Sequence, residues 1–169
     1  MSYHPSRSVF CAILLAVAGF LMCGCNSGLP NNFDRLPLER QVKEYELHIK
    51  RYGRPVRHAR AVIAQHGFDA ANLACGRLAT GDQSLPGYEA LQIIHSVQTG
   101  GCSLKKTRCE SVVRSFVAEH PIDSSDGYFA RVTLDAIENN YTSPTEHIAA
   151  CGNDRSRKPP ASATGTTRP

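Results

Sequence analysis

Residues 84–98, which read SLPGYEALQIIHSVQ, carry the pattern that decides the fold. At helical spacing, the non-charged side chains of this stretch lie on two sides of one helix. One side carries Tyr88, Leu91 and His95, and the other carries Ala90, Ile93, Ile94 and Val97. A helix that is apolar on two sides has to be covered on both, so the stretch predicts the central helix of a bundle.

Helical spacing continues on both sides of this stretch. Over residues 38–52 the apolar positions recur at intervals of four and three, and Gly53 with Pro55 ends that helix. Further helices are expected over residues 57–66, over 70–79 with Asp69 as N-cap, over 103–120 with Cys109, Val112, Val113 and Phe116 facing inward, after the turn at 123–127, and from a capping box at 143–146 to Gly152. Because no alternating pattern of strand length occurs, we predict an all-α fold, a compact bundle of about six or seven short helices over residues 34–152.

Length and composition set the class of protein. The chain has 169 residues, which is typical of one domain, and its 41% hydrophobic content is too high for a wholly disordered chain. A net charge of +4 and a pI of about 8.7 fall short of the dense basic footprint of a nucleic-acid-binding protein. We therefore expect no nucleic-acid partner.

The N-terminus carries a targeting signal. Val9 to Met22 form a 14-residue run without a charge, preceded by Arg7. That length is typical of a signal peptide, because a membrane-spanning helix needs roughly 20 apolar residues. The run ends in Leu21-Met22-Cys23-Gly24-Cys25, and a polar, turn-rich stretch follows.

These residues resemble a bacterial lipoprotein signal whose lipobox ends at Cys25. Gly24 matches the small residue before the lipidated cysteine, whereas Met22 departs from the usual leucine. The resemblance implies an acylated thioether at Cys25, of the kind that palmitate labels, and cleavage just before it. It also implies the periplasmic face of the outer membrane in a Gram-negative cell, because Asn26 and not aspartate follows. An uncleaved membrane span and a cleaved, secreted form are the alternatives.

The resulting organisation has four parts. Residues 1–24 are the signal peptide, residues 25–33 the lipid anchor and tether, residues 34–152 the helical domain, and residues 153–169 a tail expected to be disordered. The tail has no large apolar side chain that could join a core.

Four cysteines remain in the helical domain, namely Cys75, Cys102, Cys109 and Cys151. In an exported protein an even number predicts two disulfides, with three possible connectivities. A helix from Ser103 would hold Cys102 and Cys109 roughly 10 Å apart, beyond disulfide reach. We therefore favour Cys75–Cys109 with Cys102–Cys151, although four free, buried thiols are the alternative.

Charge is uneven along a domain that is neutral as a whole. Between residues 47 and 66 there are five cations and no acid, whereas residues 119–146 hold six acids and one cation. The basic segment consists of Lys50, Arg51, Arg54, Arg57 and Arg60. It is a candidate contact for anionic lipid headgroups or an acidic partner. The alternative is that the two segments are solvated surfaces that attract each other within the domain.

No sequence motif for catalysis, metal or cofactor binding stands out. The turn at 123–127 resembles a calcium loop, but Ile122 occupies the position where a carboxylate is required. His95, Cys102 and Cys109 recur at intervals of seven, yet disulfide formation competes for both thiols. We predict no metal and no cofactor, and no catalytic residue can be assigned.

These observations predict a lipid-anchored protein of the bacterial envelope that is not an enzyme. It would serve as an interaction or assembly module and bind a segment of an envelope protein in a groove between helices. Two alternatives remain open. One is an envelope hydrolase with a site of dispersed Glu, Asp and His residues, and the other is a lipoprotein that binds a small ligand between helices.

Overall fold

The computed structural model describes residues 28–143 and 147–152, and in this part of the chain every regular element is a helix. The elements are η1 (Phe33–Arg35), α2 (Leu38–Tyr52), α3 (Arg57–Ala64), α4 (Phe68–Thr80), α5 (Gly87–Thr99), α6 (Arg108–Glu119), α7 (Ser125–Glu138) and α8 (Ala149–Gly152). The predicted all-α fold is confirmed. None of the helices in the described ranges is long and apolar enough to cross a membrane.

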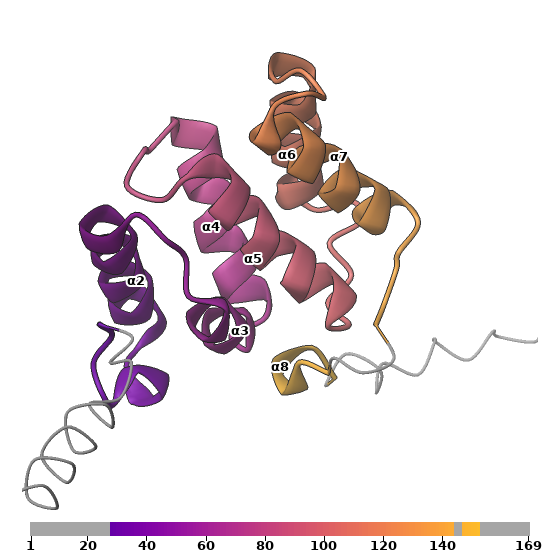
Figure 1. Cartoon of the computed structure of the whole chain (residues 1–169). Helices are drawn as coiled ribbons and strands as arrows, with labels where there is room; N and C mark the ends of the chain where they lie inside the picture. Colours follow the sequence, from indigo (N-terminus) through magenta and orange to yellow (C-terminus); the bar gives the residue numbers. More distant parts are fainter. Residues whose placement is uncertain (1–27, 144–146, 153–169) are drawn as a thin grey trace, which may run out of the picture.

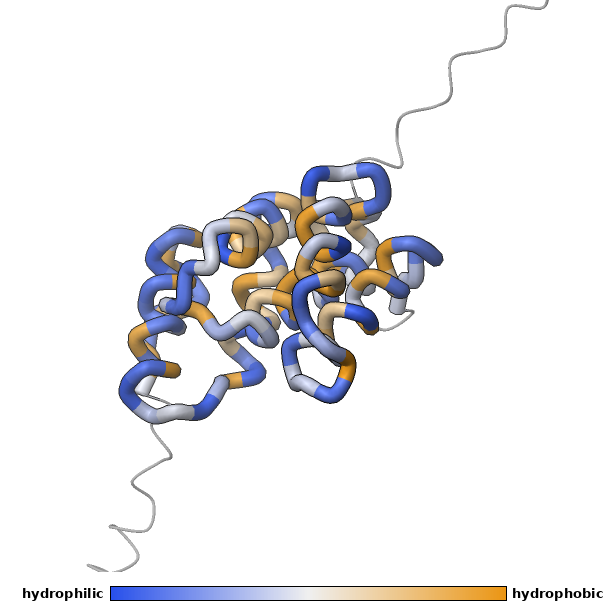
Figure 2. Tube along the Cα trace, turned by 90° about the horizontal axis from the view of Figure 1, so that it is seen from above, coloured by the Kyte–Doolittle hydropathy of each residue, from blue (hydrophilic) through white to orange (hydrophobic). Residues whose placement is uncertain are grey.

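Helix α5 is the centre of the fold, as its sequence predicts. It packs against α3, α4 and α7, and Figure 1 shows it between α2 and α3 on one side and α6 and α7 on the other. Both apolar sides contribute to the core, since Ala90, Ile94 and Val97 on one side and Leu91 on the other have no exposed surface, while Tyr88 and His95 are half-buried. Figure 2 shows the same arrangement as hydrophobic residues gathered on the inward sides of the helices.

The helix predicted from Ser103 begins only at Arg108. Residues 103–107 form a loop because Leu104 enters the core and its backbone N–H donates to the Gln98 side chain at 2.9 Å. Lys106 has a left-handed backbone, with φ of 63°, which no helix tolerates. The contact of Leu104 with α5 therefore keeps residues 103–107 in a loop, where a helix was expected.

Two other predicted helix starts are also corrected. Gly67 and not Asp69 occupies the N-cap of α4, while Asp69 lies in the first turn, where a carboxylate faces the positive end of the helix dipole. At the C-terminal end, residues 144–146 of the expected capping box lie outside the described residues. His147 and Ile148 are not helical, and α8 begins at Ala149.

Two disulfides join distant parts of the chain, and they are the pairs that the sequence favoured. Cys75 of α4 is bonded to Cys109 of α6 with Cα atoms 5.6 Å apart, and Cys102 is bonded to Cys151 of α8 with Cα atoms 5.0 Å apart. The distance argument against Cys102–Cys109 was nevertheless wrong. It assumed one helix for both residues, but α6 begins at Arg108 and Cys102 lies before it.

The segment before α2 belongs to the folded body. Leu29 and Phe33 are buried, and the Phe33 carbonyl accepts a hydrogen bond at 3.1 Å from the side chain of Gln41, which is buried. The tether expected over residues 25–33 is therefore shorter. Its described part, from Gly28 onward, is packed against the domain.

Removing the Cys102–Cys151 disulfide should destabilise the protein markedly. The bond closes a loop across 49 residues of sequence. Closing such a loop lowers the entropy of the unfolded chain and stabilises the folded state by about 2–4 kcal/mol. We expect Cys102→Ala/Cys151→Ala to lower the urea midpoint accordingly. Peptide mapping without reductant should recover both pairs, with a reduced digest as control, and a Cys102–Cys109 peptide would contradict the structure.

Candidate functional site

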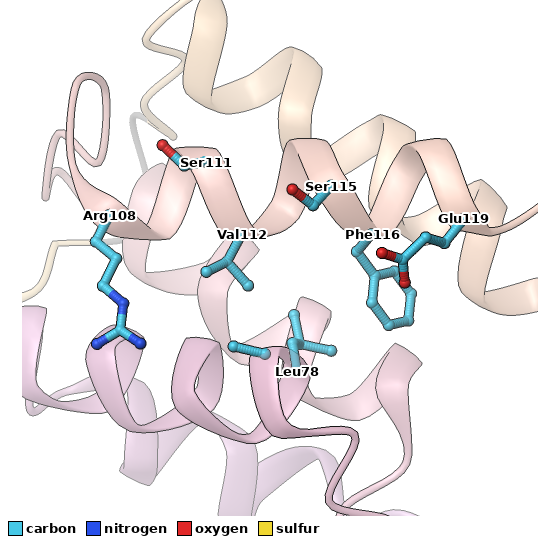
Figure 3. A pocket seen from close by; sticks show the side chains of 8 residues that line it. Leu78, Arg108, Ser111, Val112, Ser115, Phe116 and Glu119 are labelled. Atoms are coloured by element: carbon cyan, nitrogen blue, oxygen red, sulfur yellow. The ribbon is translucent and has the colours of Figure 1, made fainter.

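A groove lies between α4 and α6. Its hollow of about 410 Å³ has an apolar floor, and Figure 3 shows Val112 and Phe116 of α6 pointing toward Leu78 of α4. Arg108 and Glu119 stand at its two ends. The hollow is large enough for several side chains of a bound segment.

The spacing of residues along α6 explains how the groove forms. Its lining residues on α6 recur at intervals of three and four, so they share one helix face. They are Arg108, Ser111, Val112, Ser115, Phe116 and Glu119. Helical spacing predicts that Val112 and Phe116 lie in the core with Cys109 and Val113. The structure buries only the latter pair fully, and leaves Val112 and Phe116 half-buried.

The groove continues beyond Phe116. A second hollow of about 660 Å³ shares Leu78, Phe116 and Glu119 with the first, and extends to His120 and Asp126 at the start of α7. Within the described residues, neither Arg108 nor Glu119 forms an ion pair. The groove is therefore elongated, with Arg108 at one end, and with Glu119, Asp126 and the ion pair of Arg77 with Asp82 lining the second hollow.

The predicted basic segment is divided by the fold. Lys50 and Arg51 lie in the last turn of α2, and Arg54 lies in the turn that follows it. Arg57 is the first residue of α3, and all four side chains are exposed. Arg60 is different, because its side chain is 14% exposed and its Nη1 lies 3.3 Å from Oε2 of Glu89. Arg60 is thus withdrawn from the contact surface that the sequence assigned to it.

Glu89 is the centre of a buried polar cluster that helical spacing alone does not predict. Its side chain has no exposed surface, and it accepts a hydrogen bond from the Tyr45 hydroxyl at 2.5 Å. Arg60 balances its charge and also contacts Gln92. Burial, followed by the hydrogen bond to Glu89, raises the pKa of Tyr45, so the phenol keeps its proton. The sequence does contain one sign of this cluster, because Glu89 is the only acidic residue in the otherwise uncharged stretch 84–98.

The acidic and basic segments do not attract each other through ion pairs in the described part of the chain. Arg60 pairs with Glu89 of α5, whereas the α7 residue Glu138 pairs with Arg114 of α6 at 2.8 Å. The cations of the segment that remain exposed are therefore available to another molecule.

The carboxylates with shifted pKa values serve local structure. A hydrogen bond from the Ser84 backbone lowers the pKa of Asp82, and one from the Lys106 backbone lowers that of Glu110. Both shifts are opposite to what a general acid needs near neutral pH. Both residues stabilise turns that precede a helix.

The residues considered for a metal are not brought together as ligands. Cys102 and Cys109 belong to separate disulfides, and His95 of α5 is half-buried. Residues 28–143 and 147–152 contain no group of three or more His, Cys, Asp or Glu side chains that could hold a metal ion. Cys25 lies outside the described residues.

Removing the Tyr45 hydroxyl should cost stability out of proportion to its size. Tyr45→Phe leaves the buried Glu89 carboxylate one donor short, which costs about 1–3 kcal/mol. Tyr128→Phe is the matched control, because that side chain is 56% exposed. Urea unfolding of the two variants measures the difference. Equal stabilities would contradict the role given to this hydrogen bond.

Comparisons with known proteins add no relative to these observations. No protein-family model, no curated protein and no solved structure matches this chain. Its function is therefore inferred from its own residues and surfaces.

Proposed function

We propose that this protein is a lipid-anchored, non-enzymatic interaction module of the bacterial cell envelope. The lipobox that ends at Cys25 supports the anchor, and Asn26 after it favours the periplasmic face of the outer membrane in a Gram-negative cell. Two disulfides suit an exported domain in an oxidising compartment. The elongated groove between α4 and α6 is the observation that carries the interaction role.

The groove favours a protein segment as its occupant. Apolar side chains of the segment would cover Leu78, Val112 and Phe116, which are the large apolar side chains of the first hollow. An acidic residue would meet Arg108 at one end, and a basic residue would meet Glu119 at the other. This is recognition of an amphipathic segment by a groove between helices.

The geometry gives less support to the two alternatives. A carboxyl group that acts as a general acid near neutral pH works best with a raised pKa, whereas the shifted carboxylates Asp82 and Glu110 have lowered pKa values. A candidate place for a small ligand is a hollow of about 420 Å³ between α3, α5 and α7, which Arg57, Gln92, His95 and Phe129 help to line. A thermal-shift screen with small carboxylates and phosphates tests that second candidate.

Cys25 should carry the lipid. Cells grown with tritiated palmitate are expected to label the wild-type protein and a Cys23→Ala variant, because Cys23 follows the bulky Met22. Cys25→Ala should lose the label and keep the mass of the uncleaved chain. Gel autoradiography and intact-mass analysis provide the readouts. A label that persists in Cys25→Ala would refute the anchor.

A photo-crosslinking residue in the groove should capture the partner. With benzoylphenylalanine at Ser115, we expect one discrete adduct in living cells, mapped to a segment with an acid and a base at its two ends. Gln65, exposed at the C-cap of α3 and outside the lining of the groove, is the control position and should give none. Leu78→Glu should abolish the adduct from Ser115, because it places a charge in the apolar floor. An adduct unaffected by Leu78→Glu would exclude the groove as the binding site.

A further inference from the structure

We infer that the C-terminal end of α2, with the turn that follows it, is a surface that rests on an anionic phospholipid bilayer. This membrane-facing surface consists of Leu47, Lys50, Arg51, Tyr52 and Arg54. The inference rests on the proposed anchor at Cys25. It adds the orientation in which the anchored domain is held.

The chain enters the folded body at this surface. Gly28 packs against the end of α2 so closely that a Cβ atom on it would lie 2.6 Å from the Tyr52 ring and 3.1 Å from Nδ1 of His48. A shallow hollow joins Gly28 to Leu47, Arg51 and Tyr52. Leu29 is buried immediately after Gly28, so the entry point is fixed in the fold.

The distance from the entry point to the proposed lipid is short. Gly28 lies three positions after Cys25, and a fully extended chain covers about 11 Å over that length. A cysteine whose acyl chains are in the bilayer lies at its interface. Whatever surface surrounds Gly28 is consequently within a few side-chain lengths of the headgroups.

The side chains around Gly28 have the chemistry of a membrane interface. Leu47 and Tyr52 are large hydrophobic residues that are 51% and 47% exposed. Lys50, Arg51 and Arg54 lie three, four and seven positions after Leu47, so the α2 residues among them share the face of Leu47. Arg51 also lies over the Tyr52 ring, 5.9 Å from its centre. Exposed apolar side chains with cations beside them bind anionic lipid, as amphipathic interfacial helices do.

The neighbouring charged groups leave this surface cationic. Of the nearby acids, Glu44 pairs with Arg40 and Glu46 pairs with Arg77, both at 3.0 Å. His48 adds no charge near neutral pH, because burial and the nearby Arg54 lower its pKa. Arg60, which the sequence grouped with these cations, faces Glu89 instead.

Seating the domain in this way leaves the groove accessible. Figure 1 shows α2 at one side of the body and α6 with α7 at the other, with α4 and α5 between them. With α2 on the bilayer, helix α6 remains on the part of the domain away from α2.

A single tryptophan tests the orientation, because the natural chain contains none. The full lipidated protein with Tyr52→Trp would be reconstituted into vesicles of phosphatidylcholine and phosphatidylglycerol that carry brominated acyl chains. We expect its emission to shift to the blue and to lose most of its intensity by bromine quenching. Tyr128→Trp, on α7 and similarly exposed, is the matched control and should keep its emission.

Two further measurements separate the anchor from the orientation. Vesicle flotation reports the anchor alone, and Lys50→Gln/Arg51→Gln/Arg54→Gln in the Tyr52→Trp protein should weaken quenching while flotation persists. Protein that floats but shows equal quenching at positions 52 and 128 would overturn the orientation and leave the anchor standing. Protein that carries no palmitate and does not float would overturn the anchor itself. Equal quenching in phosphatidylcholine alone would refute the role of the cations.

Discussion

The burial of α5 on both of its apolar sides is the interaction on which the rest of the structure depends. Helices α3 and α4 cover one part of it and α7 another, so the chain has to fold around this helix from both directions. Glu89 lies within the buried surface, and an unpaired carboxylate there would be strongly unfavourable. Tyr45 and Arg60 satisfy it, and in doing so they bring α2 and α3 against the centre.

The difference between local and long-range contacts explains which elements can be predicted from the sequence. Apolar spacing within a helix is a local signal, so α2 and α5 are predicted nearly to the residue. The start of α6 is decided by a contact between the Gln98 side chain and the Leu104 backbone, which no local pattern records. The burial of Phe33 depends in the same way on Gln41, eight residues ahead.

The candidate sites follow this division. The charge pattern correctly predicts the exposed cations Lys50, Arg51, Arg54 and Arg57. It does not show that Arg60 forms an ion pair with Glu89 of α5. The groove could not be predicted from α6 alone, because whether Val112 and Phe116 are covered depends on Leu78 and Ala79 of α4. The proposed membrane-facing surface and the groove lie on different helices, so a segment bound in the groove would be held away from the lipid.

The packing of Leu29 and Phe33 also bears on the order of events during maturation. A signal peptidase needs an extended backbone around the bond that it cleaves, and in this chain the folded body starts three residues beyond Cys25. If the segment from Gly28 to Phe33 docked early, it would withdraw the cleavage site from the enzyme. On the proposed cleavage before Cys25, Leu29 and Phe33 would enter the core after that step, and completion of the core would then be coupled to release from the export machinery.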